Sequence, residues 1–337
     1  MTDEWKNKIF NASCEQMDAI PDASVDTCVT SPPYFGLRDY DHADQIGREE
    51  TFDEYVAKMV RVFREVRRTL RPNGTLWLNL GDTYYQGPSK KSGSESRAMK
   101  AKDQMLVPHT IAMALRDDGW WLRDTIVWAK TNAMPSPIRD RTTPAHEYVF
   151  LLSKSPRYYY DYQAAMVKSR SDHTAPEDIP QENLFGSDLP NVPVLQLKVT
   201  SLDDLTTRNL DLRKTDGEGV GKESHRTGLR TAKNLSAAYK NVDWASIGAN
   251  PRSVWSISPA RYFGKHFATM PEELARRCIV TGSPPGGVVL DPFSGSGTTL
   301  AVALGTGRSF VGYEINPEYC AMIQDRLGIF SPFKKDM

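Results

Sequence analysis

The chain has few of the features that mark secreted, membrane-spanning or zinc-binding proteins. Its 337 residues include only four cysteines, which are scattered without any CxxC pair: Cys14, Cys28, Cys278 and Cys320. This spacing indicates neither a disulfide framework nor a structural zinc site, so no metal is expected. No apolar run reaches the roughly 18 residues of a membrane-spanning helix, and residues 1–10 lack the apolar core of a signal peptide. We therefore expect a soluble protein of the reducing cytoplasm.

The chain also has no excess of charge of either sign. Lysine and arginine together number 42, as do aspartate and glutamate, so the formal net charge is zero. A protein that coats nucleic acid without regard to sequence is usually basic, so this class is not indicated, although a local basic face could still bind DNA. The length allows one large α/β domain with an insertion, or two domains.

Hydrophobic periodicity in the first 162 residues alternates between strands and helices. Residues 52–70 carry apolar side chains at helical spacing, and residues 105–118 predict a second helix. The stretch Arg71–Gly74 contains Pro and Gly and is expected to end the first helix before a strand at 75–80. Further strands are predicted at 24–30, 121–129 and 147–153, and the polar residues 86–104 predict a loop. This alternation predicts a mainly parallel α/β sheet with helices on both faces.

The middle of the chain, residues 163–248, loses this apolar periodicity. Between Arg208 and Lys240 there are eight basic residues against four acidic ones. One interpretation is a solvated linker. The other is a target-recognition insertion whose basic side chains contact DNA phosphates and base edges, with Arg208, Arg213, Arg226 and Arg230 as candidates.

The most informative motif lies near the end of the chain. The run Val288–Asp291 is followed by a Gly-rich turn and by Thr298 and Thr299, which predicts a strand, a tight turn and a helix start. In an α/β sheet such a turn lets backbone and helix N–H groups approach a ligand. A second short strand ends at Glu314, 23 residues after Asp291, where a dinucleotide-type fold places the acid that binds ribose hydroxyls. Taken alone, the turn could equally be a simple helix cap.

A second motif, Ser31-Pro32-Pro33-Tyr34, follows an apolar stretch near the start of the chain. The exocyclic amine of cytosine or adenine is a poor nucleophile because its lone pair is delocalised into the ring. The Ser31 hydroxyl and the Pro32 carbonyl could accept the amine hydrogens and so restore the lone pair, while Tyr34 or Phe35 could stack on a base rotated out of the duplex. The alternative is a rigid turn after a strand, because Pro-Pro often ends one.

Together, Ser-Pro-Pro-Tyr first and Asp-Pro-Phe-Ser-Gly-Ser-Gly-Thr-Thr last resemble the amino-group DNA methyltransferases that use S-adenosylmethionine. The order of the two motifs resembles the circularly permuted β group of that family. The resemblance implies a Rossmann-like class I methyltransferase sheet with a catalytic half at residues 1–162, a target-recognition insertion at 163–248 and a cofactor-binding half at 249–337. It implies a restriction-modification enzyme whose partner is double-stranded DNA, and it allows a homodimer and a cognate restriction endonuclease.

The resemblance also assigns roles to individual residues. It implies that catalysis uses Ser31, Pro32, Pro33 and Tyr34. It implies that S-adenosylmethionine is held by Asp291, Phe293, Gly295, Ser296, Gly297, Thr298, Thr299 and Glu314, together with Phe267 and Pro271. The stretch Asn11–Cys14 resembles the wall beside the cofactor's adenine. Segments between residues 126 and 161, including Tyr158–Asp161, resemble the far wall of the base pocket, and Arg139 and Arg141 join Phe35 as DNA contacts.

Serine at the first position of the tetrapeptide favours cytosine N4 as the target, because relatives that methylate adenine N6 more often carry Asp-Pro-Pro-Tyr. Adenine N6 stays open as the alternative, since the two groups share a mechanism. A cytosine-C5 methyltransferase needs a Pro-Cys dipeptide, which this chain lacks, and a P-loop NTPase needs a Lys after Gly297. A dehydrogenase leaves the tetrapeptide unexplained, and a noncatalytic DNA-binding relative would not need both motifs intact.

Overall fold

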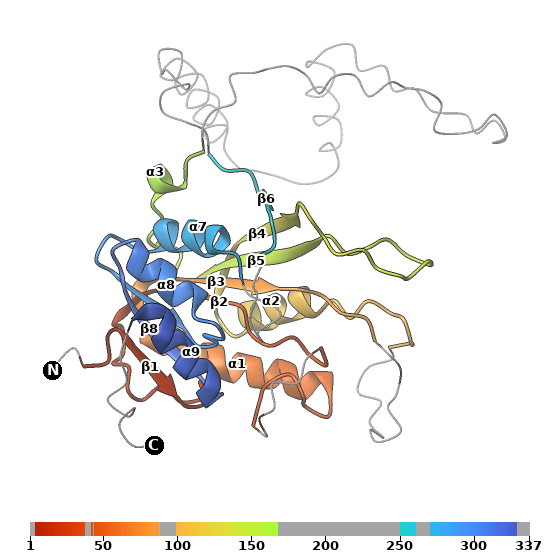
Figure 1. Cartoon of the computed structure of the whole chain (residues 1–337), viewed down its shortest axis with the longest axis horizontal. Helices are drawn as coiled ribbons and strands as arrows, with labels where there is room; N and C mark the ends of the chain where they lie inside the picture. Colours follow the sequence, from red (N-terminus) through yellow and green to blue (C-terminus); the bar gives the residue numbers. More distant parts are fainter. Residues whose placement is uncertain are drawn as a thin grey trace, which may run out of the picture. The chain divides into compact units, whose positions relative to one another are not determined.

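A sheet of eight strands forms the centre of the part of the chain that the computed structural model describes (Figure 1). The described residues are 4–37, 42, 44–85, 87, 99–167, 250–260 and 270–328. The strands are β1 (Lys8–Asn11), β2 (Val25–Thr30), β3 (Leu70–Leu80), β4 (Trp121–Lys130), β5 (His146–Ser153), β6 (Val254–Ile257), β7 (Val288–Asp291) and β8 (Ser309–Glu314). The helices within those ranges are α1 (Phe52–Thr69), α2 (Val107–Asp117), α3 (Tyr162–Ala165), α7 (Glu272–Gly282), α8 (Thr298–Gly305) and α9 (Pro317–Leu327). None of these helices is long and apolar enough to cross a membrane.

The strand order is β1-β8-β7-β2-β3-β5-β4-β6, so strands from the two ends of the chain alternate within one sheet. Neighbouring strands are parallel except that β5 runs antiparallel to both β3 and β4. The strands β4 and β5 follow one another without an intervening helix, as antiparallel neighbours do. The predicted α/β class with a mainly parallel sheet is confirmed, and the reversed strand is an addition to it.

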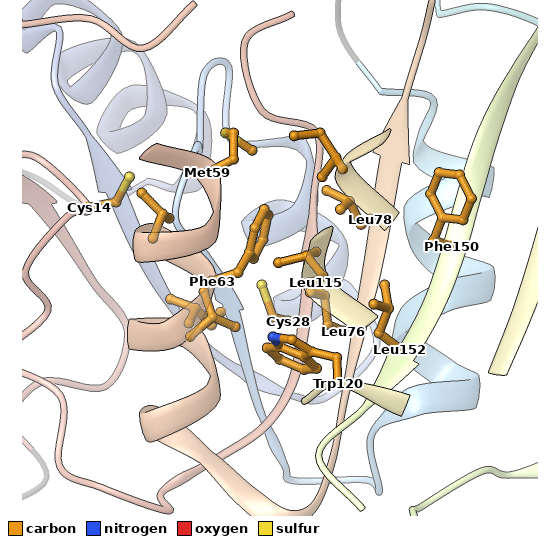
Figure 2. Packing of buried hydrophobic residues seen from close by; sticks show 14 of the residues in the cluster. Cys14, Cys28, Met59, Phe63, Leu76, Leu78, Leu115, Trp120, Phe150 and Leu152 are labelled. Carbon is orange, nitrogen blue, oxygen red and sulfur yellow. The ribbon is translucent and has the colours of Figure 1, made fainter. Parts of the chain in front are cut away.

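Two hydrophobic cores cover the two faces of the sheet, because successive side chains of a strand point to opposite faces. In β3, Leu76 and Leu78 belong to the core formed with α1 and α2, whereas Trp77 belongs to the core formed with α7 and α8. Figure 2 shows part of the first core, in which Phe63 of α1 and Leu115 of α2 lie beside these leucines. Helices therefore lie on both faces, as predicted.

The helix α1 runs directly into β3, without the turn that the sequence predicts. The expected stop at Arg71–Gly74 lies inside the strand. Leu70 pairs with Val25 and Thr75 with Thr27, and the register shift between these pairs absorbs the extra residues of β3. The Pro and Gly therefore produce an irregularity in the ladder, which is a common place for them within a strand.

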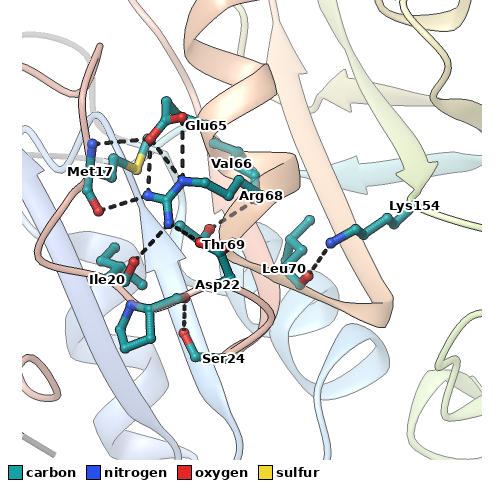
Figure 3. A network of polar contacts seen from close by, with 11 residues as sticks. Met17, Ile20, Asp22, Ser24, Glu65, Val66, Arg68, Thr69, Leu70 and Lys154 are labelled. Carbon is teal, nitrogen blue, oxygen red and sulfur yellow. Dashed lines mark hydrogen bonds and ion pairs between the residues drawn. The ribbon is translucent and has the colours of Figure 1, made fainter.

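The segment between β1 and β2 is fastened to α1 by Arg68 (Figure 3). The guanidinium donates to the backbone carbonyls of Met17 (3.0 Å) and Ile20 (3.0 Å). It also donates to the carboxylates of Glu65 (3.0 Å) and Asp22 (2.6 Å). The planar fork of arginine donors can hold several acceptors at once. Arg68 therefore fixes the segment that carries residues 12–14 toward the site described below.

The segment after β3 leads into α2 through Asp82. Its carboxylate accepts from the Val107 N–H (2.9 Å) and from the Gln104 side-chain amide (2.8 Å). The helix α2 has no side-chain cap of its own, so Asp82 supplies an acceptor for one N–H group at its start. Most of the loop predicted at 86–104 lies outside the described residues.

Candidate active site

A cavity of about 620 Å³ lies at the carboxyl ends of the parallel strands β2, β3, β7 and β8. Residues that follow each of these strands line it. In open α/β sheets ligands bind at this edge, and the volume is in the range of cofactor sites. The two motifs predicted from opposite ends of the sequence thus meet at one cavity.

A hydrogen bond joins the two motifs directly. The Thr30 hydroxyl, on the last residue of β2, donates to Oδ1 of Asp291, on the last residue of β7 (2.6 Å). The same oxygen accepts from the Phe293 N–H (3.1 Å). Because Ser31 follows Thr30 in the chain, this aspartate couples the position of the tetrapeptide to that of the Gly-rich turn.

Asp291 is an unusual acid. Its side chain is 3% exposed, and burial raises the pKa of the carboxyl to about 6. The hydrogen bonds from Thr30 and from the Phe293 N–H lower the pKa because they favour the ionised form, but they do not offset the burial. Asp291 therefore titrates much closer to neutral pH than an exposed aspartate does.

The turn between β7 and α8 requires glycine at two positions. Gly295 (φ 50°) and Gly297 (φ 75°) have left-handed backbone conformations, which side chains with a Cβ rarely adopt. At Gly297 a Cβ would also lie 2.8 Å from Cγ2 of Ile323 in α9. Gly297 is the N-cap of α8, so the turn brings a helix N-terminus to the edge of the cavity. Such a terminus favours polar or anionic groups of a ligand.

Glu314, at the end of β8, has its carboxylate at the cavity. Its Oε2 accepts from the Gly295 N–H (2.8 Å) and its Oε1 from the Asn316 N–H (2.9 Å), while burial raises its pKa above the ordinary value. Each carboxylate oxygen can accept about two hydrogen bonds, so both keep capacity for ligand hydroxyls. Phe293 and Ile315 line the cavity nearby. This combination of a part-satisfied acid and apolar neighbours fits the ribose and purine of a nucleoside.

The tetrapeptide after β2 lines the same cavity. The Ser31 and Tyr34 hydroxyls are 3.3 Å apart. The Pro33 carbonyl accepts from the Tyr55 hydroxyl of α1 (2.9 Å), which anchors the tetrapeptide to that helix. Gly81, after β3, leaves room for the Tyr34 ring, since a Cβ there would lie 2.8 Å from its Cε2. Three elements therefore set the position of four residues.

A polar cluster that the sequence analysis did not single out lies beside Tyr34. The Tyr34 hydroxyl and the Asn79 side-chain amide donate to Oε2 of Glu147 (2.8 and 3.1 Å), and Lys130 Nζ donates to Oε1 (2.6 Å). Burial, with a further contribution from Glu147, raises the pKa of Tyr34 well above its ordinary value, so the hydroxyl stays a donor. Asn79 and Glu147 are polar residues in largely apolar strands, and this is the signal that could have identified them.

Most of the predicted site residues line the cavity: Ser31, Pro32, Pro33, Tyr34, Asp291, Phe293, Gly295, Ser296, Thr298, Thr299 and Glu314. Ala12, Ser13 and Cys14 line it as well. Two predicted cofactor residues are helix N-caps beside the lining, Gly297 at α8 and Pro271 at α7. Phe267, Arg208, Arg213, Arg226 and Arg230 lie outside the described residues.

Two aromatic groups expected at the base pocket do not line the cavity. The Phe35 ring packs with its centroid 5.4 Å from those of Phe52 and Tyr55, against the core formed with α1. Of the stretch Tyr158–Asp161, Tyr160 stacks with Trp77 at 6.5 Å, against the core formed with α7. Both rings bury apolar area in a core, which competes with display to a ligand.

The predicted arginine contacts lie on the connection between β4 and β5. Arg139 is exposed, and the Arg141 guanidinium lies 3.6 Å from the centroid of the Tyr84 ring. Between them, Asp140 pairs with Lys102 (2.7 Å). This connection also contributes residues 132–134 to the cavity lining. The arginines are thus near the site but are not part of the cavity wall.

Comparison with known proteins bears on what this cavity does. Residues 25–325 match the DNA methylase family. The Type II methyltransferase M.SmaI of Serratia marcescens is 36% identical over 327 residues, which cover 93% of this chain and 87% of that protein. The Type II methyltransferase M.XycI of Xanthomonas campestris pv. cyanopsidis is 35% identical over 322 residues, which cover 91% and 83%.

Solved structures share the fold at lower sequence identity. The PvuII DNA methyltransferase (cytosine-N4-specific) has a TM-score of 0.58 at 17% identity, covering 98% of this chain and 88% of its own. A DNA modification methylase from Thermus thermophilus, TTHA0409, has a TM-score of 0.52 at 22% identity, covering 97% of each chain. The predicted Rossmann-like methyltransferase fold is confirmed. Family match, relatives and fold agree, and the chain therefore belongs to the DNA methylase family of amino-group methyltransferases.

Proposed function

We propose that this protein is a site-specific Type II DNA methyltransferase that moves a methyl group from S-adenosylmethionine to the N4 amine of cytosine in double-stranded DNA. The observation that carries the proposal is the Thr30–Asp291 hydrogen bond, because it ties the Ser-Pro-Pro-Tyr motif and the Gly-rich turn to one cavity. The match to the DNA methylase family supports the reaction class.

S-adenosylmethionine carries an activated methyl group on a sulfonium sulfur, and the residues at the ends of β7 and β8 suit its remaining parts. The Glu314 carboxylate accepts the ribose hydroxyls with the lone pairs that the Gly295 and Asn316 amides leave. Phe293 and Ile315 provide apolar walls for the purine. Thr298 and Thr299, at the start of α8, complete this end of the cavity.

The target base binds at the tetrapeptide. Because Ser31 lines a cavity, a base stacked inside a duplex cannot reach it, and the nucleotide must rotate out. The Ser31 hydroxyl and the Pro32 carbonyl accept the amine hydrogens, so the nitrogen lone pair becomes available for attack. The Tyr34 ring stacks on the base, and the surplus proton leaves to water after methyl transfer.

Cytosine is favoured over adenine by the serine at position 31, and the fold shared with a cytosine-N4-specific enzyme is consistent with that choice. Adenine N6 is the second candidate, and a noncatalytic DNA-binding relative is a third. The Type II methyltransferase relatives support a place in a restriction-modification system beside a cognate endonuclease.

The test is methylation of random-sequence duplex DNA with S-adenosylmethionine, followed by base-resolved mapping of the modification. We expect N4-methylcytosine within one short recognised sequence. N6-methyladenine would support the second candidate. DNA binding without any methyl transfer by a protein that binds the cofactor would contradict the enzymatic proposal.

A further inference from the structure

Lys130 and Glu147 form an ion pair for which the proposed methyl transfer has no use. Their side chains are 24% and 14% exposed, and both residues line the cavity. Removing two charges from water costs free energy that their mutual attraction returns only in part. A largely buried ion pair inside a substrate cavity therefore calls for a role beyond stabilising the fold.

The position of the Lys130 ammonium is fixed by its surroundings. One N–H donates to Glu147 (2.6 Å), and Nζ lies 5.0 Å from the centroid of the Trp128 ring. Trp128 is itself held by a hydrogen bond from its indole N–H to the Ile257 carbonyl (2.9 Å). Glu147 is held by Asn79 and Tyr34 as described above. Since an ammonium has three donors, Lys130 keeps capacity for a ligand acceptor.

The polar groups of the cavity follow one another in a definite order. Contacts of 3.3, 2.8 and 2.6 Å lead from Ser31 to Tyr34, Glu147 and Lys130. One end of this series is the acceptor proposed for the target amine, and the other end is a cationic donor. A base whose amine lies at Ser31 directs the rest of its Watson–Crick edge along the series.

Cytosine and adenine differ at the far end of that edge. In cytosine the amine is followed by N3 and then by O2, which are both acceptors. In adenine the amine is followed by N1 and then by a C2–H group, which accepts no hydrogen bond. A donor that lies two positions from the amine therefore meets an acceptor in cytosine and a C–H in adenine.

We propose that Lys130 selects cytosine by donating a hydrogen bond to O2 of the flipped base, with Glu147 as the residue that positions and neutralises the ammonium. The inference rests on the proposed binding of the target amine at Ser31. Sites that hydrogen-bond a substrate group reject analogues that lack it, because a buried donor is then left without a partner. Cytosine is neutral, so a lysine already paired with a carboxylate suits it better than an unpaired cation would.

The test is a cycle of one substitution in the protein and one in the DNA. Single-turnover methylation by the full chain is measured for wild type and Lys130→Met, on duplexes whose target is cytosine or 2-thiocytosine. Sulfur is a much weaker hydrogen-bond acceptor than oxygen. We expect Lys130→Met to slow methylation of cytosine about ten- to a hundredfold, and 2-thiocytosine to slow wild type similarly. The sulfur substitution should add little in the Lys130→Met protein, because the hydrogen bond is already lost.

A purely structural lysine would behave differently. If Lys130 only supports Glu147 and Tyr34, its loss should slow both substrates by the same factor, and the proposal is then wrong. An unchanged rate for Lys130→Met on cytosine would also overturn it. Lys154→Met is the matched control, because Lys154 is a half-buried lysine that donates to the Leu70 carbonyl and does not line the cavity. Lys130→Arg, which keeps a cationic donor, should retain more activity than Lys130→Met.

The failure of this inference can be separated from failure of the proposed function. Modification mapping of wild type comes first, and methylated adenine there would overturn the selection of cytosine before any variant is made. If wild type methylates cytosine and the cycle shows no coupling, only the role of Lys130 fails. If Lys130→Met does not fold by thermal melting, the neutral donor variant Lys130→Gln takes its place, and the same coupling is expected at reduced size.

Discussion

Glu314 supports the Gly-rich turn and is also placed to hold a ligand, so its removal should affect cofactor binding most. The Glu314→Ala variant should bind S-adenosylmethionine roughly ten- to a hundredfold more weakly, because charge-assisted hydrogen bonds to the ribose are lost. Isothermal titration calorimetry measures this directly. Glu318→Ala, an exposed acid in the first turn of α9, is the control and should bind normally. Equal affinity of Glu314→Ala and wild type would contradict the ribose assignment.

Ser31 and Tyr34 should separate chemistry from cofactor binding. Ser31→Ala and Tyr34→Ala should lose most methyl transfer while still binding the cofactor, because neither side chain lies in the Gly-rich turn. Tyr34→Phe keeps the ring for stacking but loses the hydroxyl that donates to Glu147. We expect it to retain substantial activity, with a loss of about tenfold from the missing hydrogen bond. Single-turnover rates that fall as far in Tyr34→Phe as in Tyr34→Ala would show that stacking is not its main contribution.

The buried carboxyl of Asp291 should make stability depend on pH. Its folded pKa of about 6 lies above the ordinary 3.8, so the native state holds this proton more tightly than the unfolded chain. The resulting stabilisation is complete below pH 3.8 and is lost as the pH rises through 6. Asp291→Asn cannot ionise, and its amide oxygen can still accept from Thr30. The free energy of unfolding of wild type relative to Asp291→Asn should fall by about 3 kcal/mol between pH 4 and pH 7.

Urea titrations of both proteins at these two pH values measure the difference. The comparison cancels the titration of all other groups, which the two proteins share. A difference that does not change with pH would mean that Asp291 is ionised throughout the range, as an exposed aspartate would be.

Secondary structure elements with strong apolar periodicity were predictable, and those whose form depends on their neighbours were not. The helix α1 and the strands β2, β4 and β5 agree with prediction to within a residue at most ends. The start of β3 was missed, because pairing with β2 on both sides of Arg71–Gly74 outweighs the local preference of Pro and Gly for a turn. The helix α7 was not predicted at all, since its charged residues interrupt a short apolar face.

The packing of α7 against the sheet depends on its last residue. A Cβ at Gly282 would lie 2.8 Å from the Thr27 hydroxyl and 2.9 Å from that of Thr75, and closer still to the Trp77 indole nitrogen. Gly282→Ala should therefore force α7 away from the sheet and lower the free energy of unfolding by about 1–3 kcal/mol. Because Gly282 does not line the cavity, cofactor affinity should change little in comparison.

Gly305, the last residue of α8, gives the matched control. A Cβ there meets nothing within 4 Å, so Gly305→Ala should stabilise the protein by about 0.5–1 kcal/mol by reducing the freedom of the unfolded chain. Urea denaturation of both variants provides the comparison. Similar stability changes in the two would show that the close contact at Gly282 is not what sets the position of α7.

The whole molecule brings together what the sequence separates. Two motifs with characteristic residues could be recognised at the two ends of the chain, and the parallel pairing of β2 with β7 explains why they meet. The cluster of Asn79, Lys130 and Glu147 could not be predicted, because it is assembled from three strands and one of them is reversed. No single stretch of sequence contains its pattern. The base-facing half of the cavity is therefore the part that required a structure.

The last prediction concerns residues 163–248, which lie almost entirely outside the described residues and for which the sequence alone makes the argument. If this segment reads DNA, substitution of Arg208, Arg213, Arg226 or Arg230 should weaken DNA binding and leave cofactor affinity unchanged. A phosphate-contacting arginine should reduce the salt dependence by a slope of about 0.9 and weaken all sequences alike. An arginine that reads a base should instead relax discrimination at one position, by roughly 1–3 kcal/mol.

Deletion of residues 208–240 decides between recognition and a solvated linker. The eight basic residues of this stretch outnumber its four acidic ones, which favours contact with DNA over simple solvation. We expect the deletion variant to fold and bind S-adenosylmethionine, because Met1–Val167 and Asn250–Met337 form a compact unit of their own. It should lose affinity for the recognised sequence, measured by fluorescence anisotropy against a scrambled duplex. A deletion variant that methylates the same site with normal affinity would establish the segment as a linker and move sequence recognition to other surfaces, such as the β4–β5 connection with its two arginines.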